Sequence, residues 1–219
     1  MYEEALNILN KLENNGFKSY IVGGYPRDKY MNKESFDIDI CTSARVEDIE
    51  KLFDNVDKKY SKYGNVIIHI NNYKFEVTTF RSDKYLQNRN DVIINFVYTL
   101  EEDLKRRDFI INTLCIDKNG NYVDIMNSRE DIDNKIIRLV GDITKLKEDP
   151  LRILRAIRFA SVLNFKLDKD VEDGINKYGY LIKELSNNKK KIEIDKIMNS
   201  NNKEYGISLI KKFKLDSYL

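Results

Sequence analysis

The chain has 219 residues, of which 42% are hydrophobic and 34% charged, and its net charge is only +2. That composition excludes a disordered chain and fits one sizeable domain, or one domain with a smaller one beside it. A single histidine and two isolated cysteines argue against a hydrolase triad, a zinc site and a disulfide framework. With neither a signal peptide nor a run of apolar residues long enough to cross a bilayer, we expect a cytoplasmic protein that has no membrane partner and keeps its thiols free.

In chain order, the pattern first predicts helices and strands that alternate, as in an α/β region with a mixed sheet. The expected helices are 3–14, 26–31 and 46–53, and the expected strands are 19–22, 36–41, 65–71 and 74–81. A mobile polar loop over 82–95, a helix carrying LEEDLKRRDF and a hairpin around Asn119-Gly120 follow.

After Gly141 the pattern predicts helices only, over 150–163, 169–178, 190–199 and 204–213. A boundary near 141–147 therefore separates the α/β region from a helical region. The end of the chain is basic, since residues 181–219 hold nine lysines against five acidic residues. Those lysines fit either a surface that attracts a nucleic-acid backbone or an ordinary solvated helix face.

The most informative stretch is GGYPRD followed by FDIDI, which ends at Ile40. Asp37 and Asp39 are two residues apart on a predicted strand, so both side chains should point to one face, with the flanking Phe36, Ile38 and Ile40 in a core. Two adjacent carboxylates repel each other unless a cation lies between them, which indicates Mg²⁺. A glycine turn upstream suggests that the metal carries a nucleotide. The alternatives are a polar face on an edge strand and an ordinary turn.

A second signal is KEDPLRILRAIRF, where Arg152, Arg155 and Arg158 form one slanted stripe on a helix. Such a stripe suits a nucleotide, and it also suits a salt-bridged surface. Asp149-Pro150 is equally an ordinary helix start. In RRDFIINTLC, Arg107 either contacts a ribose or phosphate or simply complements the end of a helix dipole.

GGYPRD…FDIDI, EVTTFR, EEDLKRRDFIINTL, IIRLVGD and EDPLRILRAIRF stand in the order seen in bacterial class II tRNA nucleotidyltransferases. The chain resembles that family, which includes CCA-adding enzymes and poly(A) polymerases, over roughly residues 20–168. The resemblance implies an α+β fold, in which a polymerase-β-like nucleotidyltransferase head with a mixed β-sheet is followed by an all-α neck. The head would span 1–141 and the neck 142–219, with the family's C-terminal body and tail absent.

The resemblance also implies a role for each matching residue. Asp37 and Asp39 would hold Mg²⁺, and Glu76 would be a third catalytic acid. The other implied residues bind the nucleotide: Gly23, Gly24, Arg27 and Asp28 at the triphosphate, Arg107 at the sugar with Asp108 holding the local geometry, and Asp149, Arg152, Arg155 and Arg158 at or behind the base. Two departures are Pro26, where an aliphatic residue is usual, and the lysines of LSNNKKKIEIDKIM, where the family has a Glu-Arg motif.

Asp149 and Arg152 are residue types that can select cytosine and adenine over uracil and guanine. The Asp149 carboxylate can accept a hydrogen bond from the exocyclic amine of cytosine or adenine, and Arg152 can donate to ring atoms, whereas uracil and guanine would place a carbonyl against the carboxylate. We therefore expect CMP and AMP to be added to the tRNA 3′ end from CTP and ATP, with diphosphate released.

Four alternatives stay open. One is a partial-adding enzyme or poly(A) polymerase, and another is a truncated head that binds NTP but needs a missing body to hold tRNA. The third is a non-catalytic nucleotide- or RNA-binding module. The fourth is an enzyme that transfers nucleotides to small molecules.

Overall fold

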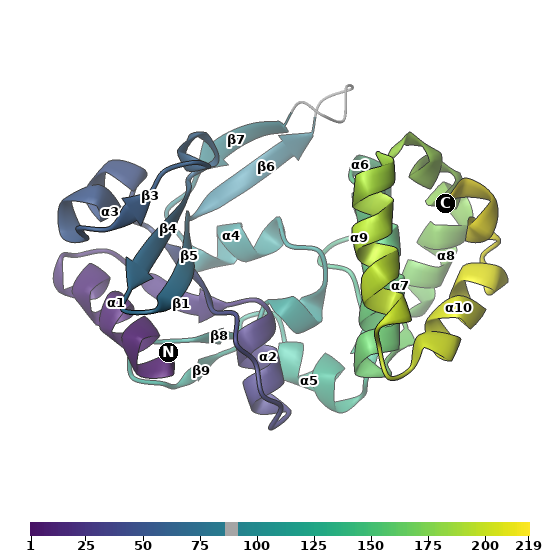
Figure 1. Cartoon of the computed structure of the whole chain (residues 1–219), viewed down its shortest axis with the longest axis horizontal. Helices are drawn as coiled ribbons and strands as arrows, with labels where there is room; N and C mark the ends of the chain where they lie inside the picture. The colour runs from purple at the N-terminus through teal and green to yellow at the C-terminus, as the bar shows by residue number, and fades with distance from the viewer. Residues whose placement is uncertain (86–91) are drawn as a thin grey trace. The chain divides into compact units, whose positions relative to one another are not determined.

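The computed structural model describes residues 1–85 and 92–219, and the chain folds into two compact units (Figure 1). The first unit comprises residues 1–107 and 111–129, and the second comprises 108–110 and 130–219. The chain thus enters the second unit briefly before its final crossing, and residues 130–141 belong to the second unit rather than to the expected head. Within the described residues, none of the helices is both long and apolar enough to cross a membrane.

A seven-stranded mixed sheet forms the centre of the first unit, in the order β3-β4-β5-β2-β1-β8-β9. In this sheet β2 and β5 pair in parallel, and the other described neighbours pair antiparallel. The strands are β1 (Ser19–Val22), β2 (Asp39–Thr42), β3 (Val56–Asp57), β4 (Asn65–Ile70), β5 (Tyr73–Thr79), β8 (Cys115–Ile116) and β9 (Tyr122–Val123). The expected mixed sheet and the hairpin at Asn119-Gly120 are confirmed.

Amphipathic helix α1 (Tyr2–Asn14) supplies much of the hydrophobic core of this unit. Ala5, Ile8, Leu9 and Leu12 are fully buried at the 3- and 4-residue spacing of one helix face, and they join a cluster that includes Ile21 of β1. The other helical segments of the unit are α2 (Gly24–Tyr30), α3 (Val46–Leu52), η1 (Ser61–Tyr63), α4 (Leu100–Lys105), η2 (Ile110–Asn112) and α5 (Ser128–Asp133). The boundary between the two units falls within η2 and within α5.

Strand β2 begins later than expected, at Asp39. The pair Val22↔Asp39 is the last between β1 and β2, because the chain turns away from the sheet at Gly23 and continues as α2. Asp37 therefore precedes the strand and is exposed. The expectation that Phe36 points into the core is wrong, since it is 81% exposed, whereas Ile38 and Ile40 are buried as expected.

The expected mobile loop over 82–95 is also wrong where the structure describes it. Strands β6 (Arg81–Tyr85) and β7 (Val92–Phe96) form an antiparallel ribbon. The expected loop also included residues 86–91, which lie outside the described residues. β6 reads RSDKY and is polar, whereas β7 reads VIINF and is largely apolar. No side chain of either strand is fully buried, so no buried face imposes an alternating pattern on their sequence. Ion pairs from Asp83 to Arg81 and Arg106, at 3.2 and 3.9 Å, tie the ribbon to the residues that follow α4.

The second unit is mainly helical, and α7 packs against α9 and α10 (Figure 1). Gly206 permits this close packing, because a Cβ there would lie 2.5 Å from Cγ2 of Ile197 and 2.8 Å from Oγ of Ser161. A short parallel pair of strands, β10 (Ile136–Ile137) and β11 (Lys166–Leu167), departs from the expectation of helices alone. The helical segments are α6 (Thr144–Glu148), α7 (Leu151–Leu163), α8 (Lys169–Tyr178), η3 (Gly179–Glu184), α9 (Asn187–Met198), α10 (Lys203–Lys212) and η4 (Leu215–Tyr218).

Candidate functional site

The glycine turn lies directly against Asp39. Gly23 has φ +86°, a conformation that side-chain-bearing residues rarely adopt, and a Cβ there would lie 3.3 Å from Oδ2 of Asp39. Glycine thus permits both the positive φ of the turn and the close approach of the backbone to the carboxylate. The next residue, Gly24, begins α2, so the turn connects the end of β1 to the helix that carries Arg27 and Asp28.

Arg27 is buried and held on two sides. Its Nε donates to Oδ1 of Asp28 at 2.9 Å, and its Nη1 donates to Oδ1 of Asn112 at 2.6 Å. Asn112 comes from a segment 85 residues further along the chain. These bonds keep the guanidinium in a single place although it starts on a short helix.

Asp39 lies in an electrostatically unfavourable place in the first unit. Burial, followed by the negative charges of Asp37 and Glu76, raises the pKa of Asp39 to about 7, although Arg107 acts in the opposite direction. Glu76 is brought there by the parallel pairing of β2 with β5, in which Asp39 and Glu76 are direct partners. The fold therefore gathers three of the expected acids, and the carboxylate of Asp39 is short of positive charge.

Arg107 is positioned by a residue that sequence reasoning missed. Asp103 is fully buried on α4, and its Oδ2 accepts from Nη2 of Arg107 at 2.9 Å. Its Oδ1 accepts from Nε of Arg106 and from the backbone N of Arg81, at 3.0 and 3.1 Å. Burial alone would lower the pKa of Arg107, but Asp103 outweighs it and raises the pKa. Nε of Arg107 is buried without a hydrogen-bond partner among the described residues.

A sequence signal for Asp103 did exist, because an acid three and four residues before two arginines on a helix is the spacing of an ion pair. Asn112 carried no such signal, since its partner Arg27 is far away in the chain.

In the second unit, Asp108 and Arg155 form a close ion pair. Oδ2 of Asp108 accepts from Nε of Arg155 at 2.7 Å, and Oδ1 accepts from the backbone N of Phe109 at 2.8 Å. Burial on its own would lower the pKa of Arg155, but Asp108 raises it overall. The pair joins α7 to the short stretch of chain that enters this unit first, and Phe109 of that stretch packs edge-on against Phe159 with ring centroids 5.7 Å apart.

The other two arginines of α7 also have carboxylate partners. Nε of Arg158 lies 3.2 Å from Glu193 on α9, and Nη1 of Arg152 lies 3.8 Å from Glu148 and donates to the carbonyl of Lys145 at 3.1 Å. The stripe is therefore paired along its length, which matches the salt-bridged alternative for its geometry. Whether it also contacts a nucleotide stays a prediction.

Asp149 ends α6 and lies directly before Pro150, the N-cap residue of α7. Oδ1 of Asp149 accepts from the backbone N of Leu151, the first residue of α7, at 3.1 Å. A carboxylate has further acceptor positions, and no described residue donates to Oδ2 of Asp149. The side chain can thus accept from the backbone N of Leu151 and still accept a hydrogen bond from a ligand.

The acids around Asp39 are the candidate ligands for a metal ion. No group of three or more His, Cys, Asp or Glu residues within 1–85 and 92–219 is arranged to hold a metal ion by itself. The environment of Asp39 still fits a cation, because a divalent ion between Asp39 and Asp37 would remove the repulsion that raises the pKa of Asp39. Mg²⁺ typically takes one or two carboxylates and completes its shell with water and substrate phosphates.

The fold and these residues define a nucleotidyltransferase-like head with a helical second unit. The family described as "Poly A polymerase head domain" matches residues 19–138, more than half of the chain, and the chain belongs to that family. The resemblance and fold class expected from the sequence are confirmed.

Particular relatives point to one kind of enzyme. The CCA-adding enzyme of Streptococcus gordonii is 39% identical over 199 residues, which is 90% of this chain and 50% of that protein. A crystal structure of the Bacillus stearothermophilus CCA-adding enzyme in complex with CTP has a TM-score of 0.92 and 36% identity, with 100% of this chain and 53% of that chain covered. A tRNA nucleotidyltransferase complexed with a primer tRNA and an incoming ATP analog has a TM-score of 0.78 and 30% identity, with 94% and 60% covered.

The chain thus spans about half the length of the curated relatives it matches.

Proposed function

We propose that this chain carries the catalytic part of an enzyme that adds CMP and AMP to the 3′ end of tRNA without a template, using CTP and ATP and releasing diphosphate. The observation that carries the proposal is Asp39, a partly buried carboxylate crowded by Asp37 and Glu76 beside a turn that only glycine fits. The relatives named for CCA addition, and solved with CTP or with tRNA and an ATP analog, support the choice of substrates. Action on tRNA would place the protein in the cytoplasm.

Mg²⁺ is the proposed cofactor, held by Asp37 and Asp39, with Glu76 as the third acid of the site. When bound, it would supply a Lewis acid that lowers the pKa of the RNA 3′-hydroxyl and offsets negative charge on the α-phosphate. The protein's own part is to hold these carboxylates together before any ligand arrives. β2 and β5 do this through their register, and Gly23 leaves the space beside Asp39 open.

The triphosphate and sugar are assigned to residues of the first unit. Gly23 and Gly24 let the backbone approach a phosphate closely, and Arg27 offers a guanidinium already fixed by Asp28 and Asn112. Arg107, held by Asp103, is the proposed sugar contact, and its unpartnered buried Nε is a donor available to a ligand.

The base is assigned to Asp149 and Arg152. Oδ2 of Asp149 would accept from the exocyclic amine of cytosine or adenine, and Arg152 would donate to ring atoms. Uracil and guanine would set a carbonyl against the carboxylate and leave buried acceptors unpaired, which disfavours both. Arg155 and Arg158, fixed by Asp108 and Glu193, and Asp108 itself would keep α7 in the required geometry.

The test is incorporation of each labelled NTP, with Mg²⁺, into tRNA that ends at the discriminator base, at -C and at -CC. The protein is compared with its Asp37→Ala/Asp39→Ala variant. Ordered addition of C, C and A that depends on the aspartates is the expected result. Addition of A alone to -CC indicates a partial-adding enzyme, and repeated A addition to any RNA indicates a poly(A) polymerase. Binding of CTP and ATP without incorporation indicates that the half-length chain needs further protein to hold tRNA.

A further inference from the structure

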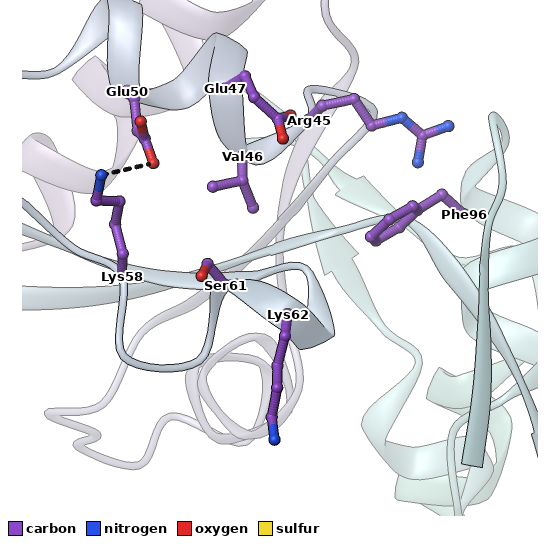
Figure 2. A pocket seen from close by; sticks show the side chains of 8 residues that line it. All are labelled: Arg45, Val46, Glu47, Glu50, Lys58, Ser61, Lys62 and Phe96. Atoms are coloured by element: carbon purple, nitrogen blue, oxygen red, sulfur yellow. Dashed lines mark ion pairs between the residues drawn. The ribbon is translucent and has the colours of Figure 1, made fainter.

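A pocket of the first unit lies beyond the end of β2 that is opposite Asp39 (Figure 2). Asp39 starts that strand, Thr42 ends it, and Arg45 follows three residues later at the pocket wall. The cavity has a volume of about 480 Å³, room for a nucleotide, and Val46, Ser61 and Phe96 also line it. Nothing in the proposed reaction uses this pocket.

Arg45 lacks a counter-ion here. Its guanidinium carbon lies 4.6 Å from the ring centroid of Phe96 and 5.4 Å from that of Tyr98, and Figure 2 shows it extended over the Phe96 ring. Among the described residues it forms no ion pair, and its Nη1 is buried without a hydrogen-bond partner. A buried cationic donor without a partner is costly, so an anion that accepted from it would be bound favourably.

The aromatic wall is fixed before any ligand binds. Gly64 has φ +72°, and a Cβ there would lie 2.5 Å from Cε1 of Phe96, so the ring rests directly on the glycine. The guanidinium of Arg81 donates to the carbonyl of Tyr63, which holds the segment beneath the ring. A stacking surface that needs no reordering binds a flat ligand without a large entropy cost.

The rim beside the pocket alternates lysine with tyrosine. The segment 58–63 reads KKYSKY, and Tyr60 and Tyr63 are 46% and 42% exposed. The amino groups of Lys59 and Lys62 lie 5.4 and 4.6 Å from the centroids of those two rings. Exposed aromatic rings interleaved with cations suit stacked bases and a phosphate backbone, the requirements of single-stranded nucleic acid.

The acidic residues of the pocket do not cancel this charge. Glu50 is paired with Lys58 at 3.5 Å, and Figure 2 shows the pair at the end of the pocket away from Arg45. Glu47 is exposed and forms no ion pair with Arg45. The positive charge of Arg45 and Lys62 is thus available to a phosphate.

We propose that this pocket and its KKYSKY rim bind unpaired nucleotides of a single-stranded RNA, separately from the nucleotide that reacts. One phosphate of the strand would accept from Arg45 in the pocket and another from Lys62 on the rim, and a base would stack on Phe96 or Tyr98. A strand rather than a free nucleotide is favoured because the aromatic and basic side chains continue along the rim beyond the pocket. The inference rests on the proposed function only in taking RNA as the substrate class.

The test measures fluorescence anisotropy of a labelled, unstructured oligoribonucleotide about 12 nucleotides long, in EDTA and without NTP. We expect Arg45→Gln and Phe96→Leu each to weaken binding about tenfold. Lys62→Ala should lower the slope of log K against log salt by about 0.7. The matched controls are Lys74→Ala and Tyr73→Leu, since Lys74 is an exposed lysine and Tyr73 an aromatic that is 40% exposed like Phe96; both should bind as the unchanged protein does.

Ultraviolet crosslinking with an oligonucleotide that contains 5-iodouridine locates the strand directly. Crosslinks to Phe96, Tyr98, Tyr60 or Tyr63 are expected, and crosslinks confined to other residues would overturn the proposal. Equal binding by the Arg45, Lys62 and Phe96 variants would also overturn it. So would displacement of the strand by ATP or inorganic phosphate as efficiently as by unlabelled oligonucleotide, because that result would define a free-phosphate site.

The Asp39→Ala variant separates this inference from the proposed function. It should lose nucleotide transfer and keep oligonucleotide binding. If Asp39→Ala transfers nucleotides at the unchanged rate while the strand still binds through Arg45, the proposed function fails and the RNA site stands. If the unchanged protein transfers nucleotides while the Arg45 variant binds the strand normally, the RNA site fails alone.

Discussion

The two units differ in how completely their charged side chains form ion pairs. In the first, Asp39 is crowded by Asp37 and Glu76 and its pKa is raised to about 7, and Arg45 lacks an ion-pair partner among the described residues. In the second, each arginine of the α7 stripe has a carboxylate partner. Beside internal ion pairs such as Arg27–Asp28, the first unit thus holds Asp39 and Arg45, which form no ion pair among the described residues. The arginine stripe of the second unit is paired throughout. This difference distinguishes side chains that a bound ion would stabilise from side chains that the fold itself holds in place.

The largest effect is expected at Asp39. Asp39→Ala should reduce nucleotide transfer by about a thousandfold or more, because it removes a proposed metal ligand. The same change should leave the melting temperature unchanged or higher, since it removes a repelled carboxylate from the fold. Steady-state incorporation and thermal unfolding check both parts. Transfer at the unchanged rate would remove Asp39 from the mechanism.

A smaller effect is expected on nucleotide choice. Asp149→Asn keeps an oxygen to accept from the backbone N of Leu151 but presents an amide donor to the base, so discrimination of CTP and ATP against UTP and GTP should fall about 10- to 100-fold. Arg152→Ala should also relax the choice. The ratio of kcat/KM for the four nucleotides measures it. Asp168→Asn is the matched control, because Asp168 caps α8 with its side chain. Unchanged ratios in both variants of the site would exclude a base-reading role.

The pairing in the second unit should appear as stability. Arg155→Ala leaves the carboxylate of Asp108, which is 8% exposed, without its partner, and we expect a loss of about 1–2 kcal/mol in the free energy of unfolding. Urea denaturation measures this loss, and Lys169→Ala, which breaks an exposed pair with Asp173 on α8, serves as the control with no measurable change expected. A double-mutant cycle with Asp108→Asn isolates the pair energy. Independent, additive effects in that cycle would contradict the coupling.

The smallest effect is a pH-dependent response to Mg²⁺. Because the pKa of Asp39 is raised from 3.8 to about 7 in the fold, its contribution to stability is present below about pH 4 and is lost as the pH rises through about 7. A cation relieves that loss only when the carboxylate is ionised. Mg²⁺ should therefore raise the melting temperature more at pH 8 than at pH 5, by a few degrees. The pH difference should vanish in Asp39→Asn, and an equal Mg²⁺ effect in that variant would place the ion elsewhere.

Much of the second unit was readable because its elements are long and periodic. The spacing of apolar residues located α7 and α8 almost to the residue. Asp149-Pro150 marked the start of α7 to within one residue, since Pro150 is the N-cap and Leu151 the first helical residue. The ribbon of β6 and β7 was missed because neither strand has a buried face, so no alternation of apolar and polar residues marks either one. Phe36 was misplaced because an apolar residue beside a strand is buried only if the strand extends to include it, and β2 starts three residues later.

By itself, the sequence determined the order of the elements, the acids at Asp37, Asp39 and Glu76, and the stripe of arginines, because local spacing and residue type carry that information. The tertiary structure alone decided which charged and polar groups far apart in the chain are paired. Asn112 reaches Arg27, Asp108 reaches Arg155 and Glu193 reaches Arg158 across 85, 47 and 35 positions of the chain. The same holds for Arg45 over Phe96, since no local pattern specifies which distant side chain folding brings to a guanidinium.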